Sequence, residues 1–159
     1  MKTARKSTST PRREGPIAVR PRAGSDPKRA PARCPGCGAV YGEGHWTWAS
    51  APRDAASHEC PACRRVRERH AGGIVTLSGP FLLAHRDEIL DIVRARETHE
   101  KAQHALERII AIEPAGDDLV VTTTEPHLAR AIVHALHGAF KGETELNEGQ
   151  SPVRATWRR

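Results

Sequence analysis

Two short stretches, Cys34-Pro-Gly-Cys37-Gly38 and Cys60-Pro-Ala-Cys63, decide how the first part of this chain folds. In each, two residues separate the cysteines, so that one tight turn can present both sulfurs to a common point. Four thiolates at about 2.3 Å complete a tetrahedral shell around Zn²⁺ and leave no position for water or substrate. The spacing therefore predicts one structural zinc ion on Cys34, Cys37, Cys60 and Cys63, in a zinc-ribbon-like module over residues 34–72.

A redox dithiol and a pair of disulfides are the competing interpretations of these cysteines. A single C-x-x-C motif would not separate them from a metal site. Here the 22 residues between the pairs match the usual ribbon separation. They also contain a predicted hairpin over residues 39–48, with Gly42-Glu43-Gly44 as its loop. The combination favours zinc.

Beyond the module, apolar periodicity predicts a regular α+β domain over residues 73–159. Strands are expected at 74–77, 109–112 and 119–123, with a last strand or hairpin over 143–146 and 153–157. Helices are expected over 81–104 and from about 126 to 139, the second with an apolar stripe at helical spacing that runs from Leu128 to Ala139. The order βαββαβ is the ferredoxin-like pattern, in which two helices cover one face of an antiparallel sheet.

The helix boundaries carry their own expectations. Ser78 and Thr124 precede the two helices and are predicted to cap them. In the first helix the apolar stripe ends at Val93, and the following residues are nearly all polar. The C-terminal half of that helix is therefore expected to project, fray or meet a partner.

The net charge of +6 is unevenly distributed. Residues 1–33 contain ten basic and two acidic residues, whereas the rest of the chain contains 15 basic and 17 acidic residues. Since residues 1–33 also lack apolar periodicity, they are predicted to form a disordered basic tail. A bulk-charge argument for nucleic acid therefore applies to this tail, which is either an electrostatic arm for RNA or a solvated leader.

A second candidate for nucleic-acid contact follows the fourth cysteine, where the run 64–70 is dense in arginine. Arginine binds phosphate, and tryptophan stacks on unpaired bases. Alternatively, the arginines form a solvated connector. The tryptophans have an alternative role as the small core of the module, and for them we favour this role. The candidate nucleic-acid-binding residues are Arg64, Arg65, Arg67, Arg69, Trp46 and Trp48.

Several classes of protein are disfavoured by what the sequence lacks. No apolar run approaches the roughly 18 residues of a membrane span, and the N-terminus lacks the apolar core of a secretory signal. No phosphate loop, dinucleotide turn or nucleophile elbow is present, and the nine histidines are scattered. The expectation is a cytoplasmic protein that is not an enzyme and has no small-molecule substrate.

The cysteine pairs, the stretch 85–90 and the stretches 116–121 and 129–132 together resemble the N-terminal half of the large-ribosomal-subunit export adaptor family. A small bacterial group of uncharacterised zinc-ribbon proteins is more similar still. The chain departs from the adaptors in having two C-x-x-C pairs rather than more. The resemblance implies a non-enzymatic module that contacts ribosomal RNA or ribosomal protein. RNA or ribosome association is therefore expected, and a protein-interaction adaptor without nucleic-acid binding is the alternative.

Overall fold

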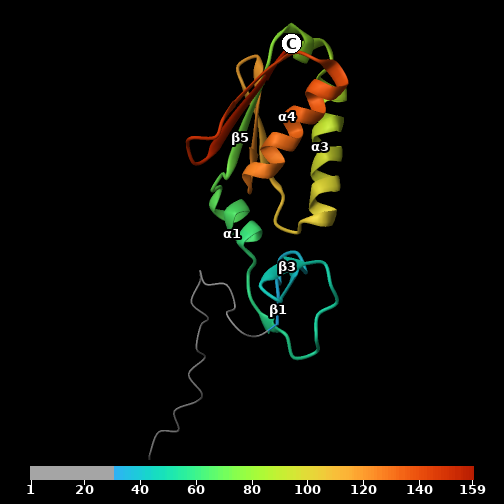
Figure 1. Cartoon of the computed structure of the whole chain (residues 1–159), viewed down its shortest axis with the longest axis vertical. Helices are drawn as coiled ribbons and strands as arrows, with labels where there is room; N and C mark the ends of the chain where they lie inside the picture. Colours follow the sequence, from blue (N-terminus) through green and yellow to red (C-terminus); the bar gives the residue numbers. More distant parts are fainter. Residues whose placement is uncertain (1–30) are drawn as a thin grey trace, which may run out of the picture.

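Two structural units, a small module of short strands and a larger layered body, make up residues 31–159, which are the residues that the computed structural model describes (Figure 1). Disorder was predicted for residues 1–33; residues 1–30 of that tail lie outside the described residues, whereas Ala32 and Arg33 form a strand. The body follows the module in sequence and contacts it through the segment between helix α3 and strand β6. Its elements are β5 (Gly73–Ser78), α2 (Pro80–Ala84), α3 (Arg86–Gln103), β6 (Ile109–Ala115), β7 (Asp118–Thr123), α4 (Pro126–Phe140), β8 (Glu143–Asn147) and β9 (Val153–Arg158).

The body confirms the predicted α+β class, and its two long helices lie side by side on one face of the sheet (Figure 1). The expected all-antiparallel sheet is wrong at one pair. The strand order is β6-β7-β5-β9-β8, and β9 runs parallel to β5. The reason is that the chain after α4 forms a complete hairpin, which places its second strand, not its first, beside β5 and leaves β8 at the edge.

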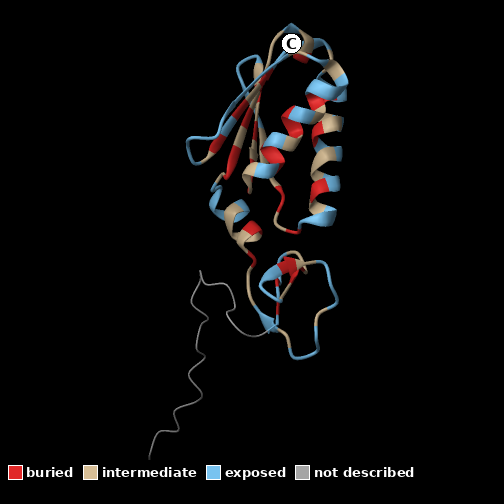
Figure 2. Ribbon diagram, in the orientation of Figure 1, coloured by how far each residue is buried: buried red, intermediate tan, exposed pale blue. Residues whose placement is uncertain are grey.

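The core lies between the helices and the sheet, where buried residues line both facing surfaces (Figure 2). Alternate residues of β5, Val75 and Leu77, are fully buried, as period-2 strands require. On α4 the large residues of the predicted stripe are buried, and Ala129 and Val133 complete the buried face. The stripe prediction is therefore confirmed at Leu128, Ile132 and Leu136.

The first predicted helix is divided in two. His85 separates α2 from α3 because its backbone leaves helical geometry, at φ −125° and ψ 31°. Its ring stacks on Phe81 with centroids 4.0 Å apart, and its Nδ1 lies 2.9 Å from a carboxylate oxygen of Glu88 in the first turn of α3. These two contacts hold the break in place.

The predicted caps are also wrong, since Gly79 and Glu125 precede α2 and α4 and neither contributes a side-chain cap. The hydroxyl of Thr124 instead bonds the backbone of residues 106 and 108, and so ties the end of β7 to the segment before β6. The polar C-terminal half of α3 packs against α4. There the Glu100 carboxylate lies 3.0 Å from the Nε2 of His127 and 3.3 Å from the Nη1 of Arg96.

The module consists of very short elements: β1 (Ala32–Arg33), β2 (Val40–Gly42), β3 (His45–Thr47), β4 (Ala56–Ser57) and α1 (Pro61–Glu68). Its sheet has the order β3-β2-β1-β4, and β2 and β3 form the predicted hairpin. Because β1 belongs to this sheet, the module begins before the boundary that was predicted at Cys34. Strands of two or three residues bury little surface, so other contacts must stabilise the module.

Candidate metal centre

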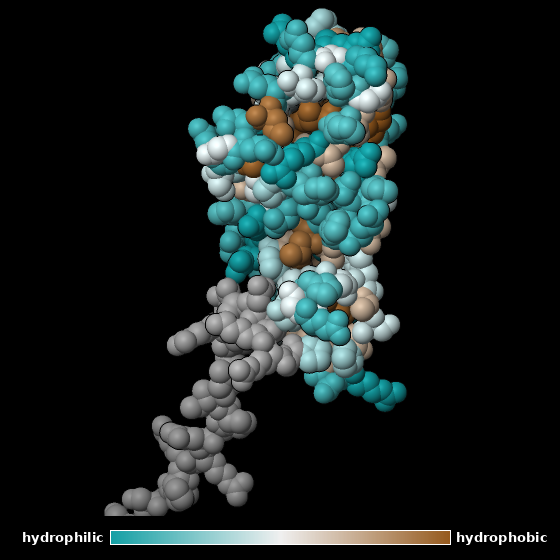
Figure 3. Space-filling view, viewed as in Figure 1, coloured by the Kyte–Doolittle hydropathy of each residue, from teal (hydrophilic) through white to brown (hydrophobic). Residues whose placement is uncertain are grey.

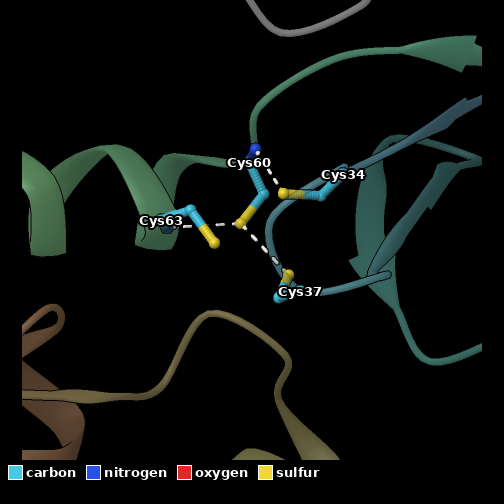
Figure 4. A group of neighbouring side chains, drawn as sticks. All are labelled: Cys34, Cys37, Cys60 and Cys63. Atoms are coloured by element: carbon cyan, nitrogen blue, oxygen red, sulfur yellow. Dashed lines mark hydrogen bonds between the residues drawn. The ribbon is translucent and has the colours of Figure 1, made fainter.

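The four cysteines converge on one point between the module's sheet and helix α1 (Figure 4). Cys34 and Cys37 lie in the turn between β1 and β2, while Cys60 and Cys63 lie at the start of α1. The four sulfurs are all within 4.8 Å of one another, and no cysteine is in a disulfide. The prediction that these four residues come together is therefore confirmed.

The sulfur spacing fits a tetrahedral zinc shell. Two thiolates bound at about 2.3 Å with tetrahedral angles are about 3.8 Å apart. The Sγ atoms of Cys37 and Cys60 lie 3.7 Å apart. Four soft thiolate donors in such a shell suit zinc and leave no open position, which is the arrangement of a structural rather than a catalytic site.

Local backbone geometry explains how each pair presents its sulfurs. Gly38 has φ 82°, in the left-handed region that favours glycine, and this lets the first turn close with a 2.9 Å bond from its amide to the carbonyl of Cys34. The second pair was expected on a similar turn, but it occupies a helix start. Cys60 is the N-cap of α1, and its sulfur accepts the amide of Cys63 at 3.3 Å. This pair therefore departs from the predicted zinc-ribbon geometry, and the helix start supplies an amide donor that favours a thiolate.

Arg108, from the body, places a cation against these sulfurs. Its Nη1 lies 3.7 Å from the Sγ of Cys63, and its Nε and Nη2 donate to the carbonyl of Ala105 at 3.2 and 3.0 Å. Burial raises the pKa of Cys37, but the hydrogen bond and charge of Arg108 outweigh it and, with the amide of Ala39, lower that pKa to about 7. Arg108 thus favours ionised sulfur, which is the form that binds metal.

The other two shifted thiols lie at the helix start. Burial raises the pKa of Cys63 to about 11 and that of Cys60 further, and Cys34 and Cys37 add to both shifts. A dication among the sulfurs would reverse this repulsion and displace the protons. Without a cation, the four cysteines cannot all ionise, because neighbouring thiolates repel one another. The arrangement of the four cysteines therefore favours binding of a cation.

The module and the body share one small apolar cluster around this centre. Ala105 and Leu106 of the body pack with Cys34, Cys60 and neighbouring module residues. Exposed Trp48 extends the contact: its Nε1 donates to the carbonyl of Lys101 at 2.6 Å, and the guanidinium carbon of Arg108 lies 5.4 Å from its ring centroid. Arg108 consequently touches the metal ligands, the body backbone and the module's surface at once.

The six residues that were predicted to bind nucleic acid lie on two elements, the arginines on α1 and its C-cap and the tryptophans on or just after β3. Trp46 is 7% exposed and packs on Tyr41, so it is a core residue of the module. Arg65 donates to the carbonyl of Thr124. Arg67 pairs with Glu59 at 3.0 Å, and Arg69 pairs with Glu113 at 2.5 Å. Among residues 31–159, Arg64 makes no ion pair, and Trp48 faces the body.

Sequence reasoning missed Arg108, which is 45 residues from Cys63 along the chain. The negative charge of a four-thiolate zinc site calls for a nearby cation, but the pattern around Arg108 does not distinguish it from the other arginines of the body. Only the tertiary packing of the segment before β6 selects it.

Comparisons with family models, with curated proteins and with solved structures return no match to this chain. The resemblance to the ribosomal export adaptors therefore stays a prediction. Within residues 31–159, no helix is both long enough and apolar enough to cross a membrane.

Proposed function

We propose that this chain is a cytoplasmic, non-catalytic zinc protein that associates with RNA or the ribosome, and that its zinc is structural. The observation that carries the zinc assignment is the convergence of four sulfurs within 4.8 Å of one another, two of them 3.7 Å apart. All four positions of the shell would be filled by protein thiolates. A metal held in this way cross-links the module and has no site for substrate.

The charge distribution supports the RNA part of the proposal. Residues 1–30 contain nine basic and two acidic residues, so they can neutralise several phosphates. The remainder of the chain is close to neutral and provides the folded support. On the face in Figure 3, hydrophilic residues cover most of the surface and apolar residues appear in patches among them.

The arginines of α1 and its C-cap support the RNA part of the proposal less directly. Their partners Glu59 and Glu113 are themselves substantially exposed. Exposed ion pairs contribute little to stability, so a phosphate can replace the carboxylate at little cost. Arg64, Arg67 and Arg69 therefore remain available to an RNA backbone that approaches α1.

An RNA titration tests this function. Full-length protein and a variant that begins at Pro31, which keeps β1 intact, are compared for binding to single-stranded RNA over a range of salt concentrations. We expect the full chain to bind RNA of any sequence, with a log–log salt slope of about −0.7 per phosphate contacted. The shortened chain should bind more weakly and with a flatter slope. No RNA or ribosome affinity of the full chain at physiological salt would reject the function.

The alternative, a protein-interaction adaptor, is supported by one feature of the body. An open groove of about 540 Å³ lies along α4 and edge strand β8, where Val133 and half-exposed Leu146 are among its lining residues. Affinity purification from the native host with and without RNase separates the two functions. A single protein retained after RNase treatment, together with no RNA affinity, would favour the adaptor.

A further inference from the structure

A polar cleft of about 520 Å³ lies on the module, where the long loop between β3 and β4 returns across the sheet; none of the four cysteines lines it. Figure 1 shows this loop as the wide arch of the module. Gly38 and Val40 line the cleft from the sheet, and residues 49–53 and Ala55 line it from the loop. Two arginines, Arg33 from β1 and Arg53 from the loop, belong to the lining.

The chemistry of this lining is that of an anion site. No carboxylate lines the cleft, and neither arginine has an ion-pair partner within residues 31–159. The Ser50 hydroxyl adds a polar group. In that same part of the chain, the backbone amides of Ser50, Ala51 and Arg53 also lack an acceptor. The two arginines and these amides are hydrogen-bond donors along one cleft, and a phosphate oxygen is an acceptor that such donors bind.

We propose that this cleft binds a phosphate group of the RNA backbone through Arg33, Arg53 and the amides of the 50–53 loop. This inference rests on the proposed function, and it adds a fixed contact that the arginine run of α1 does not include. The carbonyl of Pro31 accepts the amide of Ala56 at 3.0 Å, so the chain enters the module at β4, next to the cleft. The basic residues 1–30 are therefore attached close to Arg33, and one RNA strand can contact both.

The position of the cleft also makes it dependent on the metal. Its sheet wall includes Gly38, which follows the metal ligand Cys37, and Arg33, which precedes the ligand Cys34. Loss of zinc should therefore disorder the part of the cleft lining around Arg33 and Gly38, because the short strands of the module cannot keep these residues in place alone.

Two probes test the proposal on zinc-loaded, full-length protein: a single-stranded RNA of about twelve nucleotides, within the site sizes of single-strand-binding proteins, and inorganic pyrophosphate. The double variant Arg33→Gln/Arg53→Gln is compared with Arg154→Gln/Arg158→Gln. The control removes the same charge from exposed positions on β9. Zinc content near one ion per chain confirms that each variant keeps its module. Amide NMR shifts report pyrophosphate binding, and a salt titration reports RNA binding.

We expect pyrophosphate to shift the amides of Ser50, Ala51 and Arg53 in the wild type and the control, but not in the cleft variant. Loss of the one phosphate contact should reduce the RNA salt slope by about 0.7, which corresponds to roughly a fourfold loss of affinity at 0.15 M relative to 1 M salt. The control should change the slope by less than half of this.

Equal RNA defects in the two variants, or amides that do not respond to pyrophosphate, would overturn the cleft while leaving general RNA binding intact. Conversely, a pyrophosphate response that depends on Arg33 and Arg53, in a chain without RNA affinity, would support the phosphate site and reject the RNA function. The two failures are therefore distinguishable.

Discussion

Replacement of Arg108 by methionine tests whether the body helps to hold the metal. Methionine keeps much of the length and apolar stem of arginine but removes its charge and all five N–H donors. The substitution therefore abolishes the bond to the Cys63 sulfur, the two bonds to the Ala105 carbonyl and the cation–π interaction with the Trp48 ring. Arg108 is only 9% exposed, so water does not readily take its place.

The expected effect on zinc affinity follows from the bond to sulfur. A hydrogen bond to a charged group contributes about 1.5–3 kcal/mol, and each 1.4 kcal/mol is a factor of about ten in affinity. The bonds to Ala105 do not involve a metal ligand, so we expect them to cancel largely in a metal-binding measurement. We therefore expect Arg108→Met to weaken zinc binding by about 10–100-fold, the usual range for a group that supports a metal ligand.

Competition with a chromophoric chelator at fixed pH measures this change. Arg108→Lys, which keeps the charge but lacks the planar fork, should fall between the wild type and Arg108→Met. Arg154→Met, on the open face of the sheet, serves as the control and should leave zinc affinity unchanged. Affinity of Arg108→Met within about twofold of the wild type, or of Arg108→Lys no better than Arg108→Met, would refute the electrostatic role.

Three further outcomes follow from the structure. Elemental analysis of protein purified without added metal should find one zinc per chain, and Cys60→Ser should lose it while the far-UV circular dichroism of the body persists; two disulfides and no metal would contradict this. Ile132→Asp should destabilise the body by several kcal/mol in urea unfolding, because Ile132 is fully buried, whereas His134→Asp on the exposed face of α4 should cost little; equal costs would contradict the helix placement. Burial alone would raise the pKa of Glu100, but hydrogen bonds from His127 and Arg96 lower it. The ionised carboxylate therefore stabilises the fold at any pH above the ordinary glutamate pKa of about 4.3, and this stabilisation is lost as the pH falls through the lowered pKa of the folded state. Glu100→Gln should therefore destabilise by about 1 kcal/mol at pH 7, and the difference from wild type in urea unfolding should vanish in acid; a difference that does not change with pH would argue against the ion pair.

The local sequence pattern was sufficient to predict the cysteine cluster and the buried face of α4, because one kind of interaction dominates in each. The cysteine spacing predicts the cluster because two residues between thiolates leave few ways to bind one metal. The stripe on α4 predicts its buried face because a helix on a sheet must bury that side. Neither prediction needs knowledge of the rest of the chain.

Several of the wrong predictions involve contacts between distant segments. Thr124 has the sequence signature of a cap, but its hydroxyl is used by the backbone of Arg108 and Leu106, which lie in the preceding connection. The parallel position of β9 depends on which strand of the last hairpin pairs with β5, and both strands have suitable composition. The sequence does not show whether Arg67 and the C-cap residue Arg69 pair with a phosphate or with a protein carboxylate. The structure shows their ion pairs with Glu59 and Glu113.

The metal centre connects these observations, because the module has too little core to hold its own shape. Its strands contain two or three residues, and the cluster around the cysteines borrows Ala105 and Leu106 from the body. A metal ion on the four cysteines would supply the missing cross-link on one side. Arg108 supplies it on the other side, because its guanidinium lies against the Cys63 sulfur. The proposed phosphate cleft lies on this same module, with one wall adjacent to two metal ligands. Metal binding should therefore control RNA contact through the shape of the cleft, without any contact between the metal and the RNA.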